Sequence, residues 1–136
     1  MFKVAITDDN RQYAEMVGAY LQSKEDIEVV GYAEDGFSCI DLVRSEKPDI
    51  LLLDMMMKHL DGIAVLDRIQ RMSTRPKVII LSGRTSDYMV ERAMLKGAMD
   101  YLVKPFDLEC LYERIVDIGR SGYGYGIYQQ SNDDTI

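Results

Sequence analysis

The stretch Ile50-Leu51-Leu52-Leu53-Asp54 decides the fold, because four consecutive aliphatic residues end in a single carboxylate. A short apolar run without polar residues at alternate positions predicts a strand buried on both faces, as in a parallel sheet. Four other runs are similarly rich in Val, Ile or Leu: Lys3–Thr7, Ile27–Ala33, Lys77–Ser82 and Asp100–Lys104. The sequence therefore predicts five buried strands.

The longer segments that separate these runs carry apolar residues at helical spacing. The predicted apolar helix faces contain Tyr13, Met16, Val17, Tyr20 and Leu21; Phe37, Ile40 and Val43; Ile63, Leu66 and Ile69; Met89, Ala93 and Met94; and Leu108, Leu111, Ile115 and Ile118. Strict alternation of strand and helix implies right-handed crossovers and helices on both faces of the sheet. The expected fold class is α/β, a flavodoxin-like, doubly wound, five-stranded parallel sheet in the order 2-1-3-4-5.

Length and composition favour one folded domain followed by a short tail. A chain of 136 residues has room for one domain of ordinary size. We expect this domain to span residues 1–118. The segment 119–136 begins with Gly119-Arg120-Ser121-Gly122-Tyr123-Gly124-Tyr125-Gly126, which is typical of a linker or tail. A hinge to an effector domain and a tyrosine-rich docking element remain alternatives for this segment.

Net charge and hydropathy limit the classes of partner. The 16 basic and 23 acidic residues give a net charge of -7, and an acidic surface repels the phosphates of nucleic acid. Nucleic-acid binding is therefore expected only through an effector domain that these residues do not contain. No apolar stretch approaches the ~18 residues of a membrane span, and the first residues do not resemble a signal peptide. We expect a cytoplasmic protein with no membrane partner.

Five polar residues lie at the carboxyl ends of the predicted strands, at the edge where ligands bind in such sheets. They are Asp8, Asp9, Asp54, Ser82 and Lys104. Two carboxylates ~4 Å apart repel by about 4 kcal/mol at an effective dielectric constant of 20, so a cluster of three must take up protons or bind a cation. Donors that are all oxygen favour a hard ion, and Mg²⁺ is the expected cofactor.

Such a site is suited to phosphoryl transfer. A carboxylate can attack phosphorus and form an aspartyl phosphate, and Asp54 is the expected nucleophile. Lys104 and Ser82 are expected to contact the phosphoryl oxygens. The expected metal ligands are Asp8, Asp9, Asp54 and the backbone carbonyl of Met56. Each residue alone also fits a helix cap or a turn, but their coincidence at one sheet edge favours a site.

The residues resemble the receiver domain of two-component response regulators over about residues 2–118. The resemblance is carried by Asp8-Asp9, Leu51-Leu52-Leu53-Asp54, Leu60-Asp61-Gly62, Val78-Ile79-Ile80-Leu81-Ser82, Gly97-Ala98 and Lys104-Pro105-Phe106. It implies a phosphoacceptor switch rather than an enzyme, in which a histidine kinase or a phosphotransfer protein phosphorylates Asp54. It also implies a cis peptide before Pro105.

The resemblance further implies how the switch works. Ser82 and Tyr101 match the family's switch pair, which remodels the surface of the fourth helix, fifth strand and fifth helix. A homodimer through that surface and a transcriptional effector are expected. One position departs from the family, because Lys58 stands where proline is usual. We expect the loop 55–61 to be more mobile for this reason.

Three other functions remain as alternatives. A Mg²⁺-dependent phosphatase with an aspartate nucleophile usually has a second aspartate two residues later, whereas this chain has Met56, which cannot transfer protons. A flavodoxin-like cofactor binder would need a phosphate cradle that the turns lack. A receiver that no longer signals through phosphate is disfavoured because all five site side chains are present.

Overall fold

Ten elements alternate along the chain as the sequence predicts. The computed structural model describes residues 1–57, 59–83 and 87–121. In chain order the elements are β1 (Phe2–Thr7), α1 (Arg11–Gln22), β2 (Ile27–Ala33), α2 (Gly36–Glu46), β3 (Ile50–Asp54), α3 (Gly62–Gln70), β4 (Lys77–Ser82), α4 (Asp87–Leu95), β5 (Asp100–Val103) and α5 (Leu108–Ser121). The strand β5 ends at Val103, so Lys104 lies just past the sheet.

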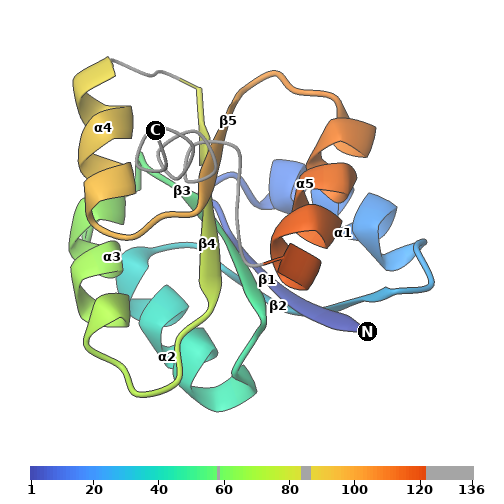
Figure 1. Ribbon diagram of the computed structural model, residues 1–136, viewed down its shortest axis with the longest axis horizontal. Helices are drawn as coiled ribbons and strands as arrows, with labels where there is room; N and C mark the ends of the chain where they lie inside the picture. The colour runs from blue at the N-terminus through green and yellow to red at the C-terminus, as the bar shows by residue number, and fades with distance from the viewer. Residues whose placement is uncertain (58, 84–86, 122–136) are drawn as a thin grey trace, which may run out of the picture.

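The five strands form one parallel sheet in the order β2-β1-β3-β4-β5, which confirms the predicted fold class (Figure 1). The central strand is β3, which pairs with β1 and β4. Thr7 lies opposite Leu53, and Asp54 lies opposite Leu81. The carboxyl ends of β1, β3 and β4 therefore meet at one edge of the sheet.

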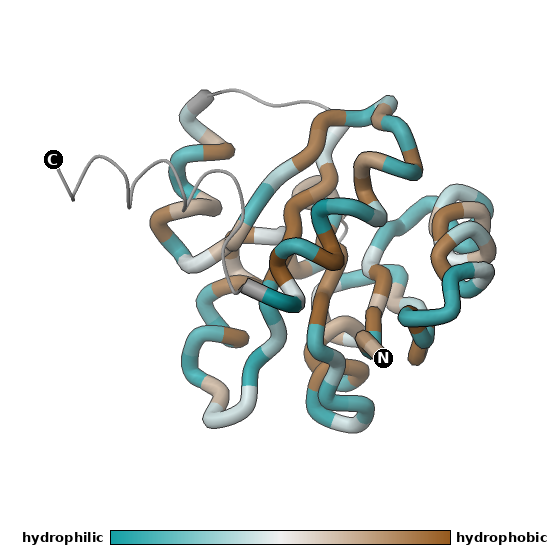
Figure 2. Tube along the Cα trace, turned by 45° about the vertical axis from the view of Figure 1, so that its right-hand side comes forward, coloured by the Kyte–Doolittle hydropathy of each residue, from teal (hydrophilic) through white to brown (hydrophobic). Residues whose placement is uncertain are grey.

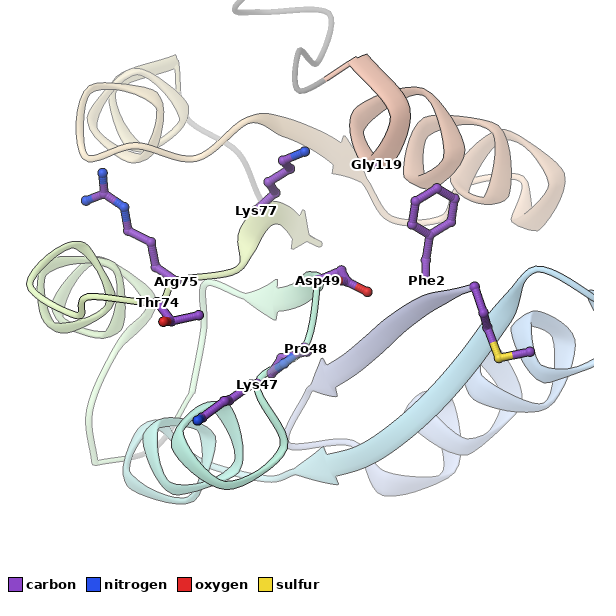
Figure 3. Close-up of a pocket in the computed structure, with 9 residues that line it drawn as sticks. Phe2, Lys47, Pro48, Asp49, Thr74, Arg75, Lys77 and Gly119 are labelled. Carbon is purple, nitrogen blue, oxygen red and sulfur yellow. The ribbon is translucent and has the colours of Figure 1, made fainter.

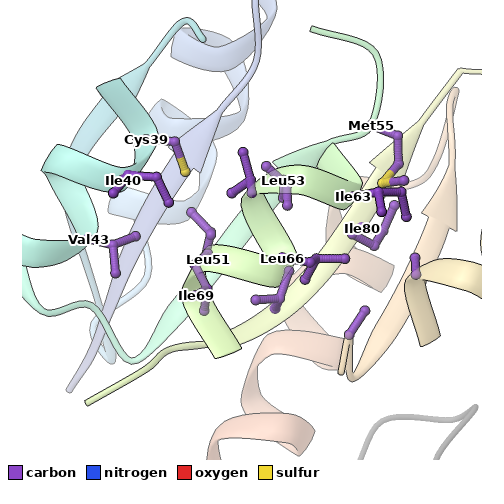
Figure 4. Close-up of a cluster of buried hydrophobic side chains, with 14 of the residues drawn as sticks. Cys39, Ile40, Val43, Leu51, Leu53, Met55, Ile63, Leu66, Ile69 and Ile80 are labelled. Carbon is purple, nitrogen blue, oxygen red and sulfur yellow. The ribbon is translucent and has the colours of Figure 1, made fainter. Parts of the chain in front are cut away.

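Helices cover both faces of the sheet, with α1 and α5 on one side and α2, α3 and α4 on the other (Figure 1). Successive residues of β3 point to opposite faces, as strand geometry requires. Ile50 and Leu52 pack against α1 and α5, whereas Leu51 and Leu53 pack against α2 and α3 (Figure 4). All four side chains are fully buried. Burial on both faces explains why the run has no polar residue.

The hydropathy of the chain follows this layering, with apolar residues concentrated in the strands (Figure 2). Two predicted apolar positions are wrong. Met16 is 49% exposed, because α1 packs on the sheet through Ala14, Val17 and Leu21, on another side of the helix. Phe37 is 51% exposed at the start of α2, where the Arg68 guanidinium lies 5.6 Å from its ring centroid.

The helix α5 continues through Ser121. Gly119, Arg120 and Ser121, which were predicted to belong to the tail, are therefore helical. The rest of the tail and Lys58, with its predicted effect on the loop, lie outside the described residues. Within the described ranges, no helix combines the length and apolar character needed to cross a membrane.

Candidate functional site

A cavity of about 540 Å³ lies at the carboxyl edge of the sheet. The loop after β1, the end of β3, the residue after β4 and the residue after β5 all contribute to it. Its lining consists of Asp8, Asp9, Asn10, Asp54, Met56, Gly83 and Lys104. Four of the five polar residues expected at this edge therefore line one cavity.

Three carboxylates converge in this cavity. One oxygen from each of Asp8, Asp9 and Asp54 lies within 4.8 Å of the others. Asp8 and Asp54 are 3% and 6% exposed, whereas Asp9 faces solvent. At this spacing each charged pair repels by on the order of 3 kcal/mol at an effective dielectric constant of 20. The three oxygens form a hard donor set that is compatible with a divalent metal ion, and Met56 lies beside them in the lining.

Lys104 offsets part of this negative charge. Its ammonium donates to Asp8 Oδ2 at 2.6 Å and lies 3.7 Å from Asp54 Oδ2. Burial disfavours the ammonium, but the hydrogen bond with Asp8 and the charges of Asp54 and Asp8 outweigh it and raise the pKa of Lys104. The lysine is therefore a cation at physiological pH. The Lys104–Pro105 peptide is cis, as the resemblance implied.

The two oxygens of the buried Asp54 carboxylate have different partners. Its Oδ1 accepts a hydrogen bond from the Met56 amide at 3.1 Å, and its Oδ2 faces Lys104. The pKa of Asp54 is raised, because burial penalises the charge more than the Met56 amide and Lys104 stabilise it. A divalent cation beside this group would favour its ionised, nucleophilic form.

Ser82 and Tyr101 lie on the neighbouring strands. Ser82 ends β4 and is buried, and its carbonyl accepts a hydrogen bond from the Lys104 amide at 2.7 Å. Tyr101 lies on β5 opposite Ile80 and is 38% exposed. Ser82 is thus tied to the same edge as Lys104, whereas Tyr101 lies further back along the sheet.

Two contacts of the site were not predicted from the sequence. The side chain of Asn10 caps α1, and the backbone amide of Asn10 donates to Asp8 Oδ1 at 2.9 Å. The ring of Tyr13 lies below Lys104, with 4.6 Å between the ammonium and the ring centroid. Burial raises the pKa of Tyr13, so the phenol stays neutral. The position of Asn10 directly after two aspartates could have indicated that it caps the helix beside them. No such signal marks Tyr13, which helical spacing placed only among the packing residues.

A second cavity, of about 370 Å³, lies at the opposite edge of the sheet (Figure 3). Two of its polar groups already serve the fold. Asp49 accepts a hydrogen bond from the Lys3 amide, and the Lys77 ammonium donates to the Ile118 carbonyl. The carboxyl edge, where three acids and a lysine converge, is the stronger candidate for chemistry.

Comparisons with known proteins agree with this geometry. The sequence matches the family model described as the response regulator receiver domain over residues 4–116. A response regulator signal receiver domain from Bermanella marisrubri is 30% identical, with a TM-score of 0.76 over 85% of this chain and 95% of that chain. The receiver domain of Francisella response regulator 1452 is 28% identical, with a TM-score of 0.80 over 90% and 99% of the two chains. The response regulator domain of Thermotoga maritima CheB is 25% identical, with a TM-score of 0.77 over 88% and 94%.

Proposed function

The chain belongs to the response regulator receiver domain family, and we propose that it accepts a phosphoryl group from phosphohistidine on Asp54 and thereby controls an effector. The single observation that carries this proposal is the placement of Asp54. Its buried carboxylate shares one cavity with two other acids and with the ammonium of Lys104. Receiver domains work with histidine kinases or phosphotransfer proteins, and one of these is the proposed donor.

The proposed reaction is an in-line transfer. An oxygen of Asp54 attacks phosphorus and forms the new P–O bond. The P–N bond of phosphohistidine breaks, and its electron pair stays on the imidazole nitrogen, which takes up a proton. Lys104 and the Ser82 hydroxyl would contact the phosphoryl oxygens. Their charge and donor capacity are most useful where negative charge gathers during transfer.

Asp8, Asp9, Asp54 and the backbone carbonyl of Met56 would hold Mg²⁺. When bound, the ion offsets the repulsion between the Asp54 carboxylate and an incoming phosphoryl group. The observation that supports this assignment is the convergent set of oxygen donors, two of whose residues are almost fully buried.

A switch requires a phosphorylated state that persists, and the residue at position 56 supports persistence. A phosphatase with the same nucleophile would need a general acid near the departing oxygen. Met56 lines the cavity and is largely exposed, and its thioether carries no transferable proton. We therefore propose slow self-dephosphorylation rather than turnover. Cytoplasmic location is part of the same proposal, since that is where the family's phosphohistidine donors act.

The proposed output runs through Ser82 and Tyr101. Movement of the Ser82 hydroxyl toward the phosphoryl group would let the Tyr101 ring turn inward and reshape the α4–β5–α5 surface. Exposed apolar side chains on this surface support its use in pairing or in effector contact: Tyr88, Leu95, Tyr101 and Val103. A homodimer and a transcriptional effector are proposed as the consequences.

Incubation with acetyl phosphate and Mg²⁺, followed by intact-protein mass spectrometry, tests the acceptor. We expect one phosphoryl group per chain in the wild type and none in Asp54→Asn. Asp107→Asn is the matched control. Asp107 Oδ1 accepts a hydrogen bond from the Glu109 amide at the start of α5, an oxygen of asparagine can accept the same bond, and Asp107 does not line the cavity. Continuous release of phosphate over many turnovers would support the phosphatase instead. Labelling that survives in Asp54→Asn would refute the assignment of the acceptor.

A further inference from the structure

The ammonium of Lys104 has a third neighbour besides Asp8 and Asp54. The centroid of the Tyr13 ring lies 4.6 Å from Lys104 Nζ. The face of an aromatic ring carries negative electrostatic potential and attracts a cation at this distance, more strongly when both groups are shielded from water. Lys104 and Tyr13 are both half-buried, so the contact is partly shielded.

Tyr13 is held in place from two directions. Its amide donates to the side chain of Asn10 at 3.1 Å in the first turn of α1. Its ring meets Phe106 edge to face, with 6.3 Å between the centroids and 82° between the planes. Because Phe106 lies two residues after Lys104 in the loop between β5 and α5, the aromatic pair connects α1 to the segment that carries the lysine.

These contacts close a ring of four residues around the edge of the site. Asp8 accepts from the Asn10 amide, Asn10 accepts from the Tyr13 amide, Tyr13 faces Lys104, and Lys104 donates to Asp8. A lysine stem has several rotatable bonds and can point in many directions. The closed ring restricts the ammonium to the space between Asp8 and the Tyr13 ring, within 3.7 Å of Asp54.

We propose that Tyr13 is a positioning residue, whose ring face holds the Lys104 ammonium beside Asp54 for phosphoryl transfer. The proposal rests on the proposed function and adds a residue that the sequence assigned to packing alone. An apolar residue without a ring could fill the same place against Phe106, but it would offer the ammonium no attractive face. The lysine would then spend less time where the phosphoryl oxygens arrive.

The test compares Tyr13→Phe with Tyr13→Leu and Tyr13→Met, two ringless variants that guard against the failure of one to fold. The measured quantity is the rate constant for labelling by acetyl phosphate at saturating Mg²⁺, in which the P–O bond to acetate breaks and acetate leaves. We expect Tyr13→Phe to react within about twofold of wild type, because the ring face is retained. The ringless variants should react between about twofold and thirtyfold more slowly, which is the range expected for loss of a cation–π contact.

Tyr20→Leu is the matched control. Tyr20 is also a half-buried tyrosine of α1 and also faces a lysine, since Lys24 Nζ lies 4.9 Å from its ring centroid. Unlike Lys104, however, Lys24 does not line the cavity. We expect the labelling rate of Tyr20→Leu to match the wild type. Equal slowing in Tyr20→Leu, equal slowing in Tyr13→Phe, or an unchanged rate in both ringless variants would each overturn the positioning role. An unlabelled wild type would overturn the proposed function itself, so the two failures are distinguishable.

Discussion

Replacement of Lys104 by methionine should make the protein bind Mg²⁺ more tightly. The Lys104 ammonium donates to Asp8 Oδ2 at 2.6 Å and lies 3.7 Å from Asp54 Oδ2. Both carboxylates are proposed ligands of the ion. Binding of a divalent cation must therefore weaken the contacts of the lysine ammonium. Lys104→Met removes this competition and keeps an unbranched side chain that is one atom shorter.

The size of the effect follows from the contact that is lost. A hydrogen bond between charged groups contributes about 1.5–3 kcal/mol, and every 1.4 kcal/mol changes an equilibrium constant tenfold. The Lys104 side chain is only 20% exposed, so solvent screens the contact weakly. We expect the dissociation constant for Mg²⁺ to fall by about tenfold to a hundredfold. The same variant should be labelled poorly by acetyl phosphate, because the phosphoryl oxygens lose their cation.

Isothermal titration calorimetry at fixed ionic strength measures the affinity directly. Lys77→Met is the matched control, because it changes the net charge equally but removes an ammonium that donates to the Ile118 carbonyl at the opposite edge. Salt at physiological strength screens charges beyond about 8 Å, so this control should bind Mg²⁺ as the wild type does. Unchanged or weaker binding in Lys104→Met would refute the competition, and so would equal tightening in Lys77→Met.

Three further predictions concern stability and reactivity. Burial raises the pKa of Asp54 above its ordinary value of 3.8, so the charge of Asp54 destabilises the metal-free protein as the pH rises through that raised value. Asp54→Asn should therefore melt at a higher temperature than the wild type at neutral pH. This difference in melting temperature should vanish in thermal scans below the ordinary carboxyl pKa. Burial also raises the pKa of the Cys39 thiol to about 11, whereas Cys110 is partly exposed. Ellman's reagent should therefore titrate one thiol in the native protein and two in denaturant. Rapid reaction of both thiols in the native protein would contradict this. A Cβ at Gly36 would overlap the carbonyl oxygen and Cβ of Leu60. Gly36→Ala should therefore lower the free energy of unfolding by about 1–3 kcal/mol in urea titrations. An unchanged midpoint would show that the loop containing Leu60 moves aside without cost.

The order and type of the elements were predictable from local pattern. The run Ile50–Asp54 lacks polar residues because β3 is buried on both faces, and this property is visible in the sequence alone. The strict alternation with helical segments then limits the topology to few arrangements. Positions on helices were less certain. Met16 has apolar spacing but lies on the exposed side of α1, because spacing defines a stripe without fixing its centre.

The carboxylates of the site were also predictable, for a topological reason. Asp8 directly follows β1 and Asp54 is the last residue of β3, and the carboxyl ends of these strands must meet if the sheet is parallel and doubly wound. The structure brings these side chains into one cavity with Lys104. Lys104 itself was predicted from its place at the end of the fifth run, although β5 ends one residue before it.

By itself the sequence determined the alternating α/β fold and the set of acids and lysine at one sheet edge, because burial and strand direction are written in local hydrophobic pattern. Only the tertiary structure decided which partners those residues take. Asp8 and Lys104 are 96 residues apart in the chain, and their contact depends on how β1 and β5 are placed in the sheet. The placement of the Tyr13 ring beneath the lysine depends further on how α1 and the loop after β5 pack. Such contacts are set by packing geometry between distant segments, which periodicity does not encode.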